Sequence, residues 1–145
     1  MNLEAIASTV VDTAYHLHED LGPGLLESVY EAILARQLIA RGLQVERQVP
    51  VTFTYQGLAF DEGFRLDLLV NKSLVVELKS VDSIVPLHFK QLLTYLRLLD
   101  QPLGLVLNFG AATFKEGVRR VVNDHRDTTG SELRVHQPGT TFSFR

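Results

Sequence analysis

The sequence predicts an α/β domain in which helices flank a mixed central β-sheet. Helical periodicity fills the N-terminal part of the chain, and strand-like alternation begins near residue 44. A third helical segment separates two apolar stretches, 74–81 and 103–110, which is the pattern of a crossover between parallel strands. The order is therefore helix, helix, three strands, helix and strand. With 145 residues, of which 46% are hydrophobic, we expect residues 1–145 to form one domain.

Three segments have the periodicity of amphipathic helices. Apolar residues recur every three or four positions over 3–21, and "LGPG" then ends the helix because Gly and Pro together mark a loop. A second helix is predicted from about 25 to 41. The third is predicted from Pro86 to about 100, since proline suits the first turn of a helix.

Strands are predicted between the second and third helices. "QVERQVPVTFTY", 44–55, alternates in polarity, and Pro50 within it indicates an edge position or a bulge. A second strand runs roughly from 58 to 70 with a bend at Gly63, and a turn then leads into the third strand, 74–81.

The C-terminal part contains one more apolar segment and a polar tail. The stretch 103–110 reads as a fourth, buried strand. Residues 115–122 are compatible with either a short edge strand or a helix turn. Residues 123–145 are mostly polar and without periodicity, so we expect an irregular C-terminal tail of the same domain.

Composition limits the classes of function. The absence of cysteine excludes disulfides, thiolate metal sites and a cysteine nucleophile. The N-terminal segment has neither a basic region nor an uninterrupted apolar run, so we expect a cytoplasmic protein without a membrane span. The net charge of −3 argues against tight, nonspecific binding of nucleic acid, because duplex-binding domains are usually basic.

The third strand, "LVVELKSV", carries a carboxylate and an ammonium group within an apolar run. If Asn71, Lys72 and Ser73 form the preceding turn, Asp67 faces Glu77 across a hairpin, and Lys79 shares the strand face of Glu77. Opposed side chains lie ~5 Å apart, where two carboxylates repel by about 3 kcal/mol at an effective dielectric constant near 20. A divalent cation would turn this repulsion into binding, and oxygen ligands suit Mg²⁺ or Mn²⁺.

Other arrangements of these charges remain open at this stage. Glu77 and Lys79 would form a neighbouring ion pair, while Asp67 pairs with Arg65. A two-residue turn would instead place Asp67 and Glu77 on opposite faces of the sheet.

Two helices carry further polar residues at helical spacing. Gly24, Glu27 and Tyr30 stand three residues apart at the start of the second helix, although an acid there also favours the helix dipole. Gln91 and Tyr95 lie one turn apart on the third helix, where a solvent-exposed polar stripe is the simpler explanation.

Taken in this order, the motifs resemble the PD-(D/E)XK nuclease superfamily. Asp67, the Glu77-x-Lys79 element and Gln91-xxx-Tyr95 resemble its RecB-like branch, and Gly24-xx-Glu27-xx-Tyr30 is similar to the small bacterial group called GxxExxY proteins. The resemblance covers roughly residues 5–122 and implies a restriction-endonuclease-like αβββαβ core with an extra N-terminal helix. Leu66 stands before Asp67, where the superfamily's name has proline.

The resemblance also implies roles for individual residues. Asp67 and Glu77 would hold Mg²⁺ or Mn²⁺, with the backbone carbonyl of Leu78 as a further ligand. Glu27 would reach the same site directly or through water.

The resemblance gives the remaining motif residues a place in catalysis. Lys79 would position or activate the attacking water, or stabilise charge on the phosphate, while Gln91 and Tyr95 would orient the site or contact the substrate. The implied function is a metal-dependent nuclease acting on nucleic acid, with DNA favoured. The alternative is a non-catalytic module of the same fold that binds nucleic acid or protein, and a homodimer or protein partner is left open.

Overall fold

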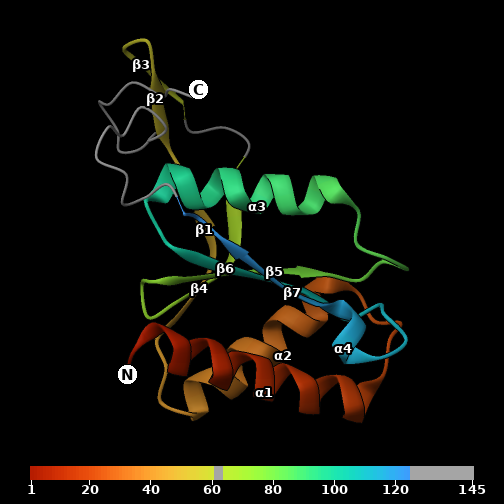
Figure 1. The fold of residues 1–145 in the computed structure, drawn as a ribbon. Helices are drawn as coiled ribbons and strands as arrows, with labels where there is room; N and C mark the ends of the chain where they lie inside the picture. The colour runs from red at the N-terminus through yellow and green to blue at the C-terminus, as the bar shows by residue number, and fades with distance from the viewer. Residues whose placement is uncertain (61–63, 125–145) are drawn as a thin grey trace.

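A computed structural model of the chain describes residues 1–60 and 64–124 and contains a mixed sheet between two helical layers (Figure 1). Its helices are α1 (Leu3–Leu21), α2 (Glu27–Ala40), α3 (Pro86–Leu99) and α4 (Phe114–Gly117). Its strands are β1 (Val45–Pro50), β2 (Phe53–Tyr55), β3 (Leu58–Phe60), β4 (Arg65–Val70), β5 (Leu74–Lys79), β6 (Leu103–Asn108) and β7 (Val118–Val122).

The five-stranded sheet has the order β1-β4-β5-β6-β7. Only β5 and β6 are parallel within it, and α3 joins them, so the predicted parallel crossover is confirmed. The chain therefore has the mixed α/β architecture of a restriction-endonuclease-like fold. Its αβββαβ core consists of α2, β1, β4, β5, α3 and β6, with α1 as the extra N-terminal helix.

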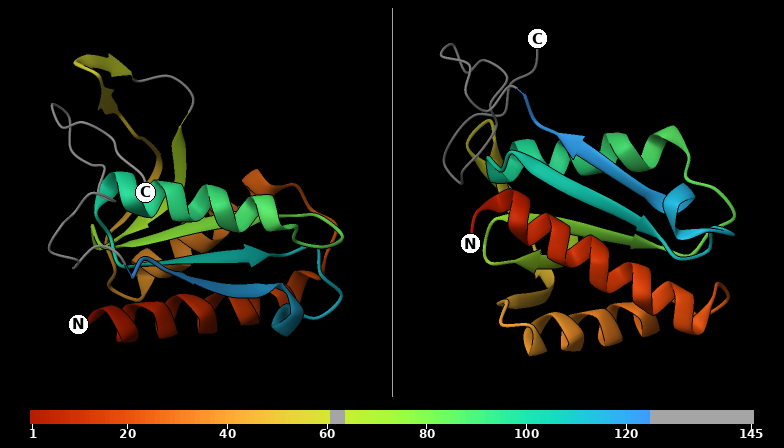
Figure 2. Two further views of the ribbon diagram at one scale, coloured as in Figure 1. Left: turned by 45° about the horizontal axis from the view of Figure 1, so that its top comes forward. Right: turned by 60° about the horizontal axis from the view of Figure 1, so that its bottom comes forward.

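The apolar core is divided between the two faces of the sheet. Helices α1 and α2 cover one face and α3 covers the other, as the views in Figures 1 and 2 show. The middle of the predicted α1 stripe is buried on the first face, where it joins inward side chains of α2 and the central strands, whereas Leu3 is only partly buried and Leu21 is exposed. On the second face, Leu92 and Leu96 of α3 pack over Val75 and Val106. Within the described residues, no helix is long and apolar enough to cross a membrane.

The prediction of two long strands, 44–55 and 58–70, was wrong. Each is divided, and the middle parts form a separate β2–β3 hairpin that projects from the main sheet (Figure 1). The division follows Pro50, which has no N–H to continue a ladder. Val51 is 1% exposed and turns into the core under α3, where its N–H donates to the carbonyl of Phe64 at 3.0 Å. The expected bend at Gly63 lies outside the described residues.

The remaining boundaries agree closely with the sequence patterns. Pro50 belongs to β1, an edge strand of the main sheet, as its position predicted. Residues 115–122 contain both alternatives, because the turn of α4 leads directly into the edge strand β7. Of the predicted C-terminal tail, residues 125–145 lie outside the described part of the chain.

Candidate metal and catalytic site

The β4–β5 hairpin has the register that the three-residue turn predicted. Val70 pairs with Leu74, and Leu68 pairs with Val76. One further step along the same register places Asp67 opposite Glu77, on the same face of two adjacent antiparallel strands. The arrangement with the two side chains on opposite faces is therefore wrong.

Side chains replace the backbone ladder at this end of the hairpin. The pairing of β4 with β5 ends at Leu68 and Val76, although both strands continue. Beyond that point the N–H of Leu78 donates to Oδ2 of Asp67 at 2.7 Å. The N–H of Asp67 in turn donates to Oε1 of Glu77 at 3.4 Å. The Asp67 carboxylate thus lies between the two strands where their ladder has ended.

Burial raises the pKa of both carboxyl groups, and the charge of Asp67 adds to the rise at Glu77. Glu77 is 8% exposed, and burial, followed by the charge of Asp67, raises its pKa to about 9. Burial also raises the pKa of Asp67, against the N–H of Leu78 and a hydrogen bond from Glu77, which lower it. The Lys79 ammonium lowers both pKa values, yet not enough to restore either to its usual range. The ionised form of the pair is therefore disfavoured at this site despite the nearby ammonium of Lys79.

The alternative ion pairs do not form in the part of the chain that the structure describes. Neither Asp67 with Arg65 nor Glu77 with Lys79 lies within ion-pair distance there. Arg65 instead directs its guanidinium to the backbone carbonyl of Gln48 at 3.4 Å. Asp67 and Glu77 therefore contact each other, and within the described residues neither carboxylate forms an ion pair with a basic side chain.

Strand β6 fixes the backbone around Lys79. The N–H of Phe109 donates to the carbonyl of Lys79 at 2.8 Å. The buried amide of Asn108 accepts from the N–H of Val81 at 3.0 Å and donates to the carbonyl of the same residue at 2.9 Å. A Cβ at Gly110 would lie 2.4 Å from that carbonyl oxygen, so only glycine allows this close approach. The backbone on both sides of Ser80 is therefore fixed by close contacts with residues 108–110 at the end of β6.

Glu27 contacts the end of β5 and does not cap its own helix. Its exposed carboxylate accepts from the N–H of Ser80 at 3.1 Å, and the Ser80 hydroxyl donates to the carbonyl of Leu25 at 2.8 Å. Glu27, Asp67 and Ser80 line one cavity of about 470 Å³. The simpler helix-dipole explanation is thus incomplete, because the side chain links α2 to the strand that carries Glu77 and Lys79.

Tyr30, the last residue of the first motif, supports the loop before α2. Its buried hydroxyl donates to the carbonyl of Gly22 and accepts from the N–H of Leu25. Its ring stacks on Phe109 with centroids 4.4 Å apart. The contacts of Tyr30 are therefore structural and hold the segment from which Glu27 reaches Ser80.

Gln91 and Tyr95 lie on α3 and line a small cavity of about 260 Å³ together with Phe64. Tyr95 meets Phe64 edge-to-face with ring centroids 5.2 Å apart. Burial raises the pKa of the Tyr95 hydroxyl, and the charges of Glu77 and Asp67 raise it further. The structure thus places Tyr95 in the electrostatic field of the carboxyl pair, while the Gln91 side chain is exposed beside it.

Two residues that sequence reasoning missed contact the site. Glu31 is 5% exposed, and its carboxylate accepts from Nε of Arg47 and from Nε2 of Gln48 at 2.9 and 2.7 Å. Nε2 of Gln48 also lies 3.4 Å from Oδ1 of Asp67. A signal existed for Glu31, because it stands one helical turn after Glu27.

The donor chemistry of the carboxyl pair fits a hard divalent cation. Within residues 1–60 and 64–124, no three acidic, histidine or cysteine side chains converge on a common point suited to a metal ion. The side-chain donors that lie together are Asp67 and Glu77, and burial raises the pKa of both carboxyl groups. Mg²⁺ is typically held by one or two carboxylates and keeps several waters, so two such groups suffice.

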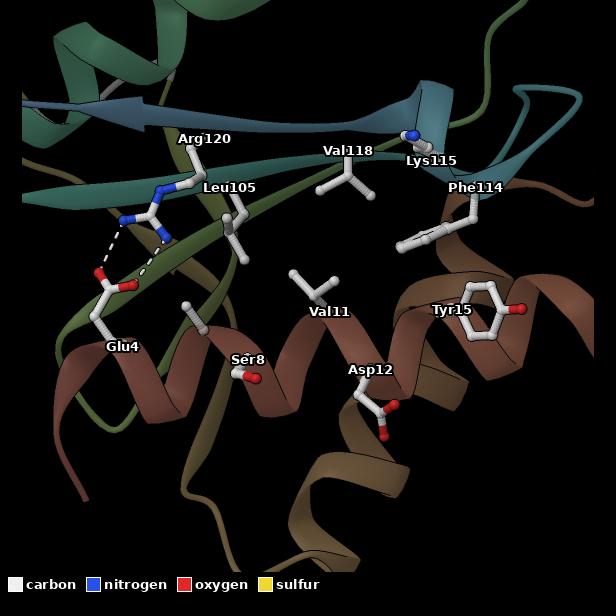
Figure 3. A pocket seen from close by; sticks show the side chains of 11 residues that line it. Glu4, Ser8, Val11, Asp12, Tyr15, Leu105, Phe114, Lys115, Val118 and Arg120 are labelled. Atoms are coloured by element: carbon white, nitrogen blue, oxygen red, sulfur yellow. Dashed lines mark hydrogen bonds and ion pairs between the residues drawn. The ribbon is translucent and has the colours of Figure 1, made fainter.

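A larger cavity, of about 680 Å³, lies between α1 and the strands β6 and β7 (Figure 3). Val11, Leu105 and Val118 give it an apolar lining, and an ion pair between Glu4 and Arg120, 2.8 Å long, lies at one end. It shares no lining residue with the cavities around Asp67 and Tyr95. This cavity is therefore separate from the carboxyl pair.

Comparison with known proteins agrees with this geometry. A family model described as the PD-(D/E)XK nuclease superfamily matches residues 4–121, which include every motif discussed above. Searches of curated proteins and of solved structures gave no match. Because the family model covers most of the 145 residues, the chain belongs to the PD-(D/E)XK nuclease superfamily.

Proposed function

We propose that this chain is a metal-dependent nuclease that hydrolyses phosphodiester bonds in nucleic acid, with DNA as the favoured substrate. The observation that carries the proposal is the opposition of Asp67 and Glu77 where the β4–β5 ladder ends, with Lys79 on the same strand face as Glu77. Nucleases of this superfamily generally use divalent metals. A buried Glu77 and a half-buried Asp67, whose pKa values stay raised despite the nearby Lys79, supply the carboxylate ligands that such ions prefer.

In this proposal Asp67 and Glu77 hold Mg²⁺ or Mn²⁺, and the backbone carbonyl of Leu78 is a further ligand. When bound, the ion lowers the pKa of the attacking water and offsets charge on the phosphate. Glu27 acts from the wall of the same cavity, directly or through water.

The remaining motif residues act on water and substrate. Lys79 positions the attacking water or stabilises charge that develops on the phosphate, and its rigid backbone suits this role because such donors work best when preorganised. Tyr95 and Gln91 orient the site or contact the substrate from α3. The electrostatic coupling of Tyr95 to both carboxyl groups supports this part of the proposal.

The finer classification and the setting also belong to the proposal. Gly24, Glu27 and Tyr30 favour the GxxExxY group, and Gln91 with Tyr95 favours the RecB-like branch. We further propose a single domain over residues 1–145 and a cytoplasmic, bacterial setting.

A cleavage assay tests the proposal. The chain is incubated with Mg²⁺ or Mn²⁺ and with single- and double-stranded DNA and RNA, and products are resolved on gels. Lys79→Ala should abolish cleavage, whereas Lys72→Ala, which removes the same charge from the exposed hairpin turn, should not. Metal-independent cleavage, or equal activity of the two variants, would refute the assigned roles.

The net charge of −3 favours a second candidate, a non-catalytic module of the same fold that binds nucleic acid or a protein partner, including a second copy of the chain. This candidate predicts no cleavage under any metal condition. It also predicts binding that Lys79→Ala and Asp67→Asn leave unchanged. Binding of labelled DNA or of a partner, measured beside the cleavage assay, separates the two functions.

A further inference from the structure

Gln48 has an unusual backbone conformation within β1. Its φ angle is +51°, although its neighbours Arg47 and Val49 pair regularly with Leu68 and Leu66 of β4. Residues other than glycine seldom adopt positive φ, and such strain concentrates at functional sites. The same register places Gln48 opposite Asp67.

The distorted backbone coincides with two contacts of the Gln48 amide. Its Nε2 donates to Oε1 of Glu31 at 2.7 Å and lies 3.4 Å from Oδ1 of Asp67. A carboxamide has two N–H groups, so one can point to each carboxylate. The amide therefore bridges an acid of α2 and an acid of β4.

Glu31 is a firm anchor for this bridge. It is 5% exposed, and Arg47 holds its other oxygen with an ion pair of 2.9 Å. On the far side, Oδ2 of Asp67 accepts from the N–H of Leu78 at 2.7 Å. The contacts thus run from α2 through β1 and β4 to β5 and restrain both oxygens of Asp67.

We propose that Glu31 and Gln48 are positioning residues that fix the orientation of the Asp67 carboxylate for metal binding. This inference rests on the proposed function, since it takes Asp67 to be a metal ligand. Neither residue needs to touch the ion, because residues that hydrogen-bond to a metal ligand orient it and strengthen binding. The strained backbone of Gln48 has a role in this arrangement, because it directs the side-chain amide of Gln48 towards the Asp67 carboxylate.

Gln48→Asn isolates the bridge from its surroundings. Asparagine tolerates positive φ better than glutamine does, so the backbone should keep its conformation. The shorter side chain loses about 1.5 Å of reach, the length of one carbon–carbon bond, and no longer spans both carboxylates. The substitution changes no charge, so a purely electrostatic influence on the site would not be altered.

Mn²⁺ titrations of the full chain, followed by calorimetry, provide the measurement. Gln48→Asn and Glu31→Gln should each weaken Mn²⁺ binding about tenfold, the lower end for residues that support a metal ligand. Glu46→Gln is the control, because it removes one negative charge from the same strand, where Glu46 pairs with the exposed Lys72 at 3.7 Å. Its affinity should stay within about twofold of wild type, as expected for a screened surface charge.

Melting of the metal-free proteins separates positioning from simple destabilisation. Gln48→Asn should melt within a few degrees of wild type, roughly what the lost bond to Glu31 costs after the relief of backbone strain, while it binds Mn²⁺ more weakly. Unchanged Mn²⁺ affinity in Gln48→Asn would overturn the positioning role, provided that Asp67→Asn abolishes binding. If wild type does not bind Mn²⁺, or if Asp67→Asn binds equally well, the proposed function fails and this inference fails with it.

Discussion

Replacing Glu77 with Gln should stabilise the metal-free protein, and the gain should grow as the pH rises. The folded pKa of Glu77 is about 9, whereas the unfolded value is near 4.5. Between these values the folded protein holds a proton that the unfolded chain releases. The stabilisation by this proton is complete below pH 4.5 and is lost as the pH rises towards 9. The amide introduced by Glu77→Gln mimics the protonated acid at every pH, so the variant escapes this loss.

The size of the effect follows from the pKa difference. From pH 4.5 to about 7.5, three pH units at 1.36 kcal/mol each give about 4 kcal/mol as an upper estimate. For a chain of this length, 1 kcal/mol shifts the melting temperature by roughly 2–4 °C. The variant should therefore melt roughly 10 °C above wild type at pH 7.5 and close to it near pH 4.5.

Thermal melts in a chelating buffer at several pH values provide the assay. Glu46→Gln serves as the control, since it removes an exposed carboxylate from β1 and should melt within about 1 °C of wild type throughout, as exposed ion pairs contribute little. A difference between wild type and Glu77→Gln that stays constant from pH 5 to 8 would refute the reasoning. It would mean that Glu77 is ionised in the folded protein and that another group holds the proton.

Three further predictions concern the site and its support. Asp67→Asn should reduce the rise in melting temperature that Mn²⁺ produces, and should lower cleavage at least a hundredfold, because it removes a carboxylate ligand; equal shifts in both proteins would remove Asp67 from the metal site. Gly110→Ala should cost about 3 kcal/mol in urea denaturation, since its Cβ would meet the Val81 backbone, whereas the Cβ of Gly104→Ala would meet the side chain of the buried Leu92, which can shift more readily than backbone, and should cost less; the reverse order would contradict the close approach. Tyr30→Phe should cost about 1–2 kcal/mol through the lost hydroxyl contacts, and an unchanged melting curve would deny them a structural role.

Local patterns in the sequence were sufficient for the helices and for the β4–β5 hairpin. The stripe of α1 and the proline at the start of α3 are local signals, and the structure follows them. The three residues after Val70 determined the turn length, and the turn length determined which face carries Asp67 and Glu77. The opposition of the two acids was therefore predictable from the sequence.

Features that depend on distant parts of the chain were not predictable. Alternation over 44–55 continued past Pro50, so it did not reveal that Val51 turns into the core under α3. Glu31 has an ordinary helical spacing, and its importance comes from Arg47 and Gln48, which a different strand supplies. The positive φ of Gln48 has no signal in residue type, because glutamine is not typical of that conformation.

The projecting β2–β3 hairpin has a consequence for how this fold tolerates changes in length. It lies within the connection 51–64, between two strands that pair with each other and need no contact from the hairpin to set their register. The entropy of closing a connection grows only logarithmically, so doubling its length costs about 0.6 kcal/mol. Insertions or deletions at the hairpin tip should therefore leave Asp67 aligned with Glu77. The domain can change how far this arm extends while the carboxyl pair stays in place.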